Sequence, residues 1–116
     1  MSFKVEPKSA FLHIKFGEDV FAQDDVKELK ALLTKHANQH VFLNLTRVEE
    51  FEDTEVLQDF QADCLDAHLS FILIVRESLM NLFDEDLPVV PTFQEAEDFF
   101  DMDEIQRKLM EEWKNS

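Results

Sequence analysis

Two short runs of consecutive apolar residues constrain the fold of this chain most strongly. They are "HVFLNL", residues 40–45, and "LSFILIV", residues 69–75. Strands that are apolar on both faces are typical of the centre of a parallel sheet covered by helices. The segment between them places Leu57, Phe60 and Cys64 on one helical stripe. Strand, amphipathic helix and strand therefore predict a crossover between two parallel neighbours, and an α/β fold.

The segments on either side extend this pattern. "FKVEP" and "AFLHIKF" are strand-like and flank Pro-Lys-Ser, which predicts an opening hairpin. In the second of these strands, apolar residues alternate with His13 and Lys15, so we expect one buried face. After the irregular stretch "EDVFAQ", the residues from Asp24 to Ala37 have the apolar spacing of an amphipathic helix.

The C-terminal third continues with "ESLMNLF" as a short helix, "LPVV" as a short strand and a closing helical region from Pro91. Thr92 and Glu95 have the spacing of a capping box, which marks the start of that last helix. We expect a kink or break between Asp101 and Glu104. The prediction is a single domain over residues 1–116, with about five strands in a mixed, mostly parallel sheet and about four helices.

The charge of the chain excludes several kinds of partner. Its 26 acidic and 11 basic residues give a net charge of −15, which repels nucleic-acid backbones and anionic membrane surfaces. No apolar run approaches the roughly 20 residues that span a bilayer, and the N-terminus has no apolar segment typical of a signal peptide. With a single cysteine, these features favour a cytoplasmic location and another protein as partner.

The order of elements resembles the STAS domain, the fold of bacterial anti-sigma factor antagonists. Gly17 lies where that family has a glycine before its first helix, and "VFLNLTRVEEFEDTEVL" is similar to the family's core strand, loop and second helix. The Asp-Ser-Ser-Gly signature is lost. In the ungapped alignment, Glu52 stands at the aspartate, Asp53 at the phosphorylated serine and Thr54 at the second serine. An alignment shifted by one residue places Thr54 at the phosphorylated position instead.

This resemblance implies a regulatory protein-interaction module whose contact surface surrounds the start of the second helix. The candidate residues are Glu49, Glu50, Glu52, Asp53, Thr54 and Glu55. Relatives that switch acquire negative charge there by phosphorylation, whereas here the charge is permanent. We therefore expect a binding module that serine phosphorylation does not switch. The alternatives are that these residues only cap the helix and complement its dipole, or that they bind a divalent cation, although their spacing matches no calcium loop.

Catalytic motifs are absent from the sequence. The four histidines are scattered and form no metal-binding or catalytic spacing: His13, His36, His40 and His68. Gly17 is the only glycine, which excludes a glycine-rich phosphate loop. We expect no catalytic residues, no cofactor and no metal ion, and we expect Cys64 to pack in the core.

The C-terminal region suggests a second interface. Phe99 and Phe100 are adjacent, so they point about 100° apart on a helix. An apolar stripe runs along this region through Phe99, Met102, Ile105, Leu109 and Trp113. One of the two phenylalanines is expected to stay exposed. Such a patch suits a homodimer or a scaffold subunit that docks an enzyme. The alternative is a long helix that wraps over a small sheet and buries all of these residues.

Overall fold

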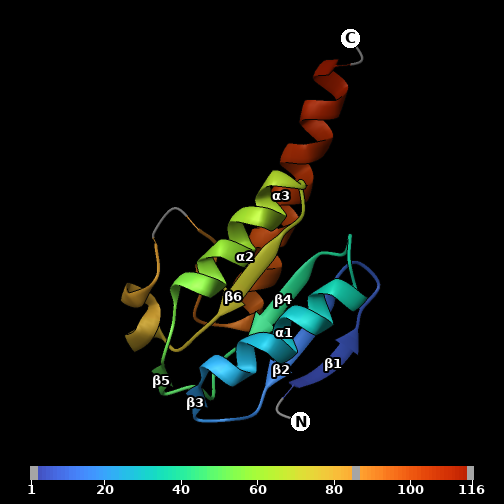
Figure 1. Cartoon of the computed structure of the whole chain (residues 1–116). Helices are drawn as coiled ribbons and strands as arrows, with labels where there is room; N and C mark the ends of the chain where they lie inside the picture. The colour runs from blue at the N-terminus through green and yellow to red at the C-terminus, as the bar shows by residue number, and fades with distance from the viewer. Residues whose placement is uncertain (1–2, 85–86, 115–116) are drawn as a thin grey trace.

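A five-stranded sheet forms the centre of the molecule, in the order β1-β2-β4-β6-β7 (Figure 1). The computed structural model describes residues 3–84 and 87–114, with side chains described as far as residue 110. The strands are β1 (Phe3–Pro7), β2 (Leu12–Phe16), β4 (Val41–Asn44), β6 (Phe71–Ile74) and β7 (Val89–Val90). β1 and β2 are antiparallel, and the other pairs are parallel. The expected α/β class, opening hairpin and neighbouring central strands are confirmed.

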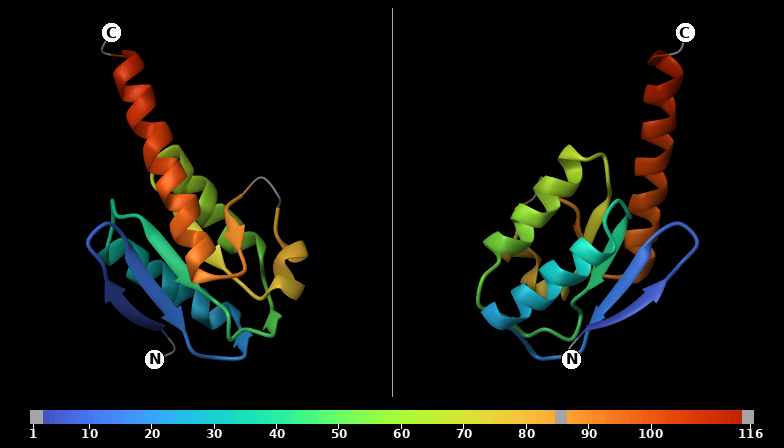
Figure 2. Two further views of the ribbon diagram at one scale, coloured as in Figure 1. Left: turned by 180° about the vertical axis from the view of Figure 1, so that it is seen from behind. Right: turned by 45° about the vertical axis from the view of Figure 1, so that its right-hand side comes forward.

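Helices cover both faces of this sheet. α1 (Gln23–Lys35) and α2 (Glu55–Asp66) lie on one face, and α3 (Phe93–Lys114) lies on the other (Figure 2). The expected short helix between β6 and β7 is a 3-10 helix, η1 (Glu77–Leu82). α1 connects β2 to β4 and α2 connects β4 to β6, so both crossovers of the central strands pass over the same face.

Two very short strands form a second sheet that the sequence pattern did not indicate. β3 (Val20–Phe21) pairs in parallel with β5 (Glu50–Phe51). The backbone N–H of Glu52 also donates to the carbonyl of Phe21 at 3.0 Å. The stretch interpreted as irregular is therefore paired with the loop after β4. This pairing holds the approach to α2 in one conformation.

The core has two parts, one on each face of the sheet. The larger part joins alternate residues of the central strands to Leu29 of α1 and Leu57 of α2. The smaller part joins the opposite faces of β4 and β6 to Ala96 and Phe100 of α3. β2 also contributes to both sides, because His13 is only 5% exposed. The expectation of one buried face for β2 holds at Lys15, which is exposed, but was wrong at His13, because its ring packs against Phe93 at the start of α3.

α3 is continuous, and the expected break between Asp101 and Glu104 was wrong. Half of the expected capping box is present at its start: the N–H of Glu95 lies 3.1 Å from the hydroxyl of Thr92, and this hydroxyl donates to the Glu95 carboxylate at 3.3 Å. No glycine or proline interrupts the sequence of the helix. Asp103 and Glu104 are instead held by contacts with Ser70 and Arg107. Asp103 and Glu104 therefore do not start a new helix. Their side chains make contacts on the side of one long helix.

The two adjacent phenylalanines of α3 give a direct test of this arrangement. Phe100 is 5% exposed on the sheet and Phe99 is 37% exposed. We expect Phe100→Ala to lower the free energy of unfolding by about 3 kcal/mol, because it leaves a cavity. Phe99→Ala should cost about 1 kcal/mol or less. Urea unfolding of both variants measures the difference, and equal losses would contradict the two-sided core.

Candidate protein-interaction surfaces

The acidic segment of residues 49–55 connects β4 to the start of α2, as the sequence predicted. It includes β5 and the first residue of α2. Asp53 supplies the cap of α2. Its Oδ1 accepts from the backbone N–H groups of Glu55 at 3.0 Å and Val56 at 3.4 Å. Thr54 makes no side-chain capping bond. Asp53 therefore satisfies backbone donors that a helix start leaves unpaired, which gives this one carboxylate a structural role.

The other carboxylates of the segment divide into one that is paired and three that are not. Glu49 lies 3.4 Å from the guanidinium of Arg76, whose Nε donates to the carbonyl of Thr46 at 2.8 Å. This link joins the loop to the end of β6. Glu50, Glu52 and Glu55 are exposed, and within the described residues their side chains form no ion pair or hydrogen bond. Three carboxylates thus remain available to a partner.

The capping role of Asp53 can be separated from the role of its neighbour. We expect Asp53→Ala to reduce the free energy of unfolding by about 1 kcal/mol, the usual value of a side-chain cap. Thr54→Ala should change it by only a few tenths of a kcal/mol, because its hydroxyl caps nothing. Thermal or urea unfolding of the two variants checks this. A larger loss for Thr54→Ala would mean that the threonine, not the aspartate, caps α2.

The described side chains that hold α3 on the sheet lie on one face of the helix. Along that face the contacts change from apolar to polar. Phe93, Ala96 and Phe100 pack on β4 and β6. One turn further on, Asp103 accepts from the buried hydroxyl of Ser70 at 2.9 Å, and Arg107 donates to the same hydroxyl oxygen at 3.3 Å. The apolar contact of α3 with the sheet therefore ends at Phe100, and polar contacts extend it to Arg107.

A second face of α3 carries an apolar stripe that points away from the sheet. Four of its members, Phe99, Met102, Ile105 and Leu109, lie three or four residues apart, so they share one side of the helix, and Met110 lies about 100° from Leu109 at the edge of that side. The α3 stripe consists of Phe99 (37% exposed), Met102 (63%), Ile105 (58%), Leu109 (49%) and Met110 (64%). The distal half of the helix extends beyond the sheet (Figure 2). The side chain of Trp113 lies outside the described residues.

The sequence predicted either packing on the sheet or an exposed interface for the C-terminal phenylalanines, and each of the two residues has one of these roles. Phe100 belongs to the core and Phe99 begins the α3 stripe. The picture of a long helix wrapped over the sheet holds only for the first two turns. The sequence did contain the signal, because α3 has apolar residues on two faces rather than one: Phe93, Ala96 and Phe100 on the first, and the α3 stripe on the second.

A groove lies where the end of α2 meets α3. It contains a cavity of about 110 Å³, lined by Gln61, Leu65, Leu69, Ser70, Phe71, Leu87, Pro88, Phe99 and Asp103. Leu65 is 65% exposed at its rim. Gln61 is 2% exposed, and its amide nitrogen donates to the carbonyls of Phe71 at 3.3 Å and Pro88 at 2.8 Å. Its Oε1 is buried and has no hydrogen-bond partner among the described residues.

His40 joins α3 to the start of β4. Its Nδ1 accepts the backbone N–H of Ser70 at 2.9 Å, so the ring proton is on Nε2, 3.5 Å from Glu104. Burial and the neighbouring Arg107 lower the pKa of His40, and Glu104 opposes them. The neutral ring also packs edge-on against Phe100. His40 is therefore a neutral connector between the helix and the sheet.

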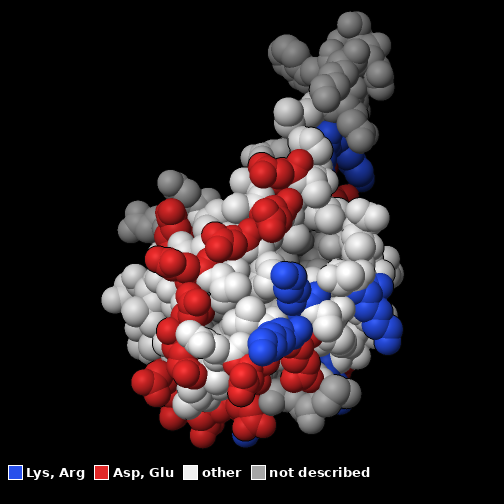
Figure 3. All heavy atoms as spheres, viewed as in Figure 1, with Lys and Arg blue, Asp and Glu red and all other residues white. Residues whose placement is uncertain are grey.

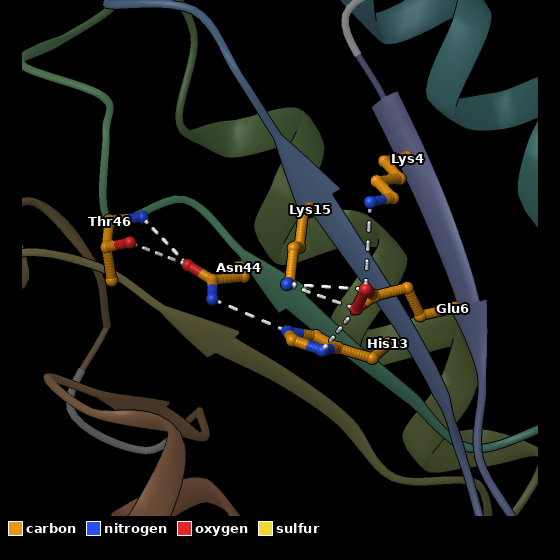
Figure 4. Close-up of polar contacts among 6 residues, drawn as sticks. All are labelled: Lys4, Glu6, His13, Lys15, Asn44 and Thr46. Carbon is orange, nitrogen blue, oxygen red and sulfur yellow. Dashed lines mark hydrogen bonds and ion pairs between the residues drawn. The ribbon is translucent and has the colours of Figure 1, made fainter.

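A second neutral histidine lies in a polar network beside the base of α3 (Figure 4). Asn44 Oδ1 accepts from Thr46, so its amide nitrogen faces His13 Nε2 at 3.4 Å. The ring proton is then on Nδ1, 3.6 Å from Glu6. Burial lowers the pKa of His13 and the charge of Lys15 lowers it further, against the opposing effect of Glu6. This network lies on the side of the sheet that faces α3, where the ring of His13 packs against Phe93.

These two histidines predict how stability depends on pH. Because the pKa of each is lowered from 6.5 in the folded protein, the unfolded chain binds more protons as the pH falls below that value. Stability should therefore be fully present above pH 6.5 and decline below it, as the pH approaches the folded-state pKa values. Urea unfolding at about pH 7.5 and about pH 5.5 measures this. A His13→Gln/His40→Gln variant should show a smaller difference, and an equal one would contradict the assignment.

Metal-binding clusters and the single cysteine were the remaining candidates for reactive groups. No group of three or more His, Cys, Asp or Glu side chains within them is placed to hold a metal ion. Burial raises the pKa of the Cys64 thiol, and Asp63 raises it further, so the thiolate form is disfavoured. Cys64 packs against the larger core, as expected. No helix in the described part of the chain is long and apolar enough to cross a membrane.

Comparison with known proteins adds no family to this picture. No protein-family model matches the chain, and no curated protein matches its sequence. The α/β architecture is compatible with the resemblance to the STAS domain, and membership of that family stays a prediction. The surfaces described above therefore carry the functional argument.

Proposed function

We propose that this protein is a non-enzymatic, regulatory protein-interaction module that binds its partner through the α3 stripe. The exposure of the stripe carries this proposal. A helix on a sheet normally turns its apolar residues toward the core, and clustered exposed apolar side chains mark binding surfaces. Here α3 has one apolar face on the sheet and a second one in solvent.

The α3 stripe is not needed to hold α3 in place. The helix is anchored by Phe93, Ala96 and Phe100 and by the polar contacts that end at Arg107. Leu109 and Met110 lie beyond these contacts and are 49% and 64% exposed. Covering apolar area contributes about 25 cal/mol per Å², so a partner that covers these side chains gains energy that the isolated fold does not use.

The acidic start of α2 is a second candidate surface for the same general function. Its support is the set of three exposed, unpaired carboxylates, Glu50, Glu52 and Glu55, at the carboxyl end of the parallel strands. In the anti-sigma factor antagonists that the chain resembles, a phosphate on the serine at this helix start controls binding. Because carboxylates are permanently charged, they favour a module whose binding is not switched by phosphorylation at this position.

Two charge-changing variants distinguish the surfaces. Met102→Glu/Leu109→Glu places two negative charges in the α3 stripe, whereas Glu52→Lys/Glu55→Lys reverses the second surface and leaves the Asp53 cap intact. Lys108→Glu is the matched control for the first variant, because Lys108 is exposed on the other side of α3 and the substitution changes the net charge equally. We expect only the stripe variant to lose its partners in affinity capture from the native host.

A fluorescent probe of apolar surface gives an independent measurement. The dye ANS should bind the wild-type chain and Lys108→Glu equally, and Met102→Glu/Leu109→Glu more weakly, because charges disrupt the exposed apolar area. Circular dichroism confirms that each variant is folded. If partner capture depends on Glu52 and Glu55 while the stripe variant retains it, the acidic helix start is the binding surface instead.

A further inference from the structure

The helix that borders the groove carries an unusual row of like charges. Glu55, Asp59 and Asp63 follow one another at four-residue spacing on α2, Asp66 follows three residues later, and the helix contains no lysine or arginine. Figure 3 shows a row of acidic side chains on the surface over α2. Like charges at this spacing destabilise a helix by about 0.2–0.5 kcal/mol per pair. Glu55 complements the helix dipole in the first turn, but the fold gains nothing from the other three acidic residues.

Acidic residues also border the α3 stripe on α3 itself. Asp98 precedes Phe99 and Asp101 precedes Met102, and both carboxylates are exposed. Asp98 lies four residues before Met102, so it continues the stripe at its N-terminal end, and Asp101 lies about 100° around the helix from Met102. The stripe and the exposed Leu65 at the end of α2 therefore form an apolar surface with carboxylates at its borders.

Two of the residues that line the cavity in the groove, Gln61 and Asp103, carry hydrogen-bond acceptors. Gln61 Oε1 is buried without a partner among the described residues. Asp103 also lines the cavity and accepts from Ser70 through Oδ2. A buried acceptor without a donor is costly, and a donor entering the cavity would relieve that cost. Leu65 and Phe99 line the same cavity as the carboxylate of Asp103, a combination that suits a cationic side chain with an apolar stem.

We propose that the groove between α2 and α3 binds an amphipathic helix of another protein whose apolar face is bordered by lysine and arginine. This inference rests on the proposed function and names the chemistry of its partner. The helix lies along the α3 stripe, and one of its cationic side chains enters the cavity beside Gln61 and Asp103. From Phe99 to Met110 the stripe extends about 16 Å at 1.5 Å per residue, the length of three turns of such a helix.

A second copy of this chain fits the groove less well. Each copy carries a net charge of −15, and a self-contact would bring the α2 acidic rows of two molecules toward the same interface. Like charges facing each other in an interface disfavour association. A basic partner instead places opposite charges along both borders of the stripe.

A synthetic peptide tests this inference without the native partner. The probe is a helical peptide of about 18 residues with leucines on one face and lysines on its borders, and the control has glutamate at each lysine. Fluorescence anisotropy should detect binding of the lysine peptide only. Raising the ionic strength from about 0.05 to about 0.5 M should weaken binding, because exposed charges are screened.

Variants of the protein locate the bound peptide. Asp63→Asn/Asp66→Asn should weaken binding about fivefold, whereas Asp24→Asn/Glu28→Gln on α1, with the same change of net charge, should not. Met102→Glu/Leu109→Glu should weaken it more than about tenfold. Asp103→Asn should weaken it about threefold. An unchanged affinity would contradict the entry of a cationic side chain into the cavity.

The outcomes separate this inference from the proposed function. If the stripe variant loses its native partners but the lysine peptide does not bind, the stated chemistry of the partner is wrong and the proposed function stands. Equal binding to the stripe variant and the wild type would place the peptide elsewhere on the acidic surface and overturn the inference. Light scattering that shows a dimer abolished by Met102→Glu/Leu109→Glu would identify a second copy as the occupant and overturn it as well.

Discussion

The burial of β4 and β6 on both faces is the interaction on which the rest of the structure depends. Phe42 and Ile72 face α3, while Leu43 and Leu73, the next residues along the strands, face α1 and α2. Because side chains alternate along a strand, helices must cover both sides of this pair. That requirement places α2 on one face and the base of α3 on the other, and it brings the end of α2 next to the middle of α3, where the groove lies.

α3 combines two functions that are usually given to different helices. Its first turns complete the smaller core through Phe93, Ala96 and Phe100. Its second face and its distal half contribute nothing to that core and present the α3 stripe. The polar contacts of Asp103, Glu104 and Arg107 lie between these regions. They end the apolar contact with the sheet without ending the helix, so the apolar surface beyond them remains accessible.

The arrangement of the central elements was predictable because it follows from local patterns. Continuous apolar strands, an amphipathic helix between them and a capping box at Thr92 each leave a direct signal in the sequence. The β3–β5 pair was not predictable, since two-residue strands have no periodicity and depend on a partner distant in sequence. The burial of His13 was missed for a similar reason, because it depends on where α3 begins over β2.

The candidate site was predictable in part. Residues 49–55 were correctly placed at a helix start, but the sequence did not show that Asp53 alone would cap it. The division between Phe99 and Phe100 followed from their adjacency. The apolar spacing of the α3 stripe was visible in the sequence, but its exposure and its position next to Leu65 were not, because an apolar helical stripe has the same pattern whether it faces a core or solvent. Only the position of α3 relative to the sheet separates these cases.

The unbroken course of α3 through Asp101–Glu104 has a mechanical consequence. A helix without a hinge transmits orientation along its axis, and this one is fastened to the sheet at its base and again at Ser70 and His40. A molecule bound to the distal end of α3 would therefore have a fixed orientation relative to the sheet, which a flexible linker would not provide. The reach and direction of whatever this protein recruits would then be dictated by its fold.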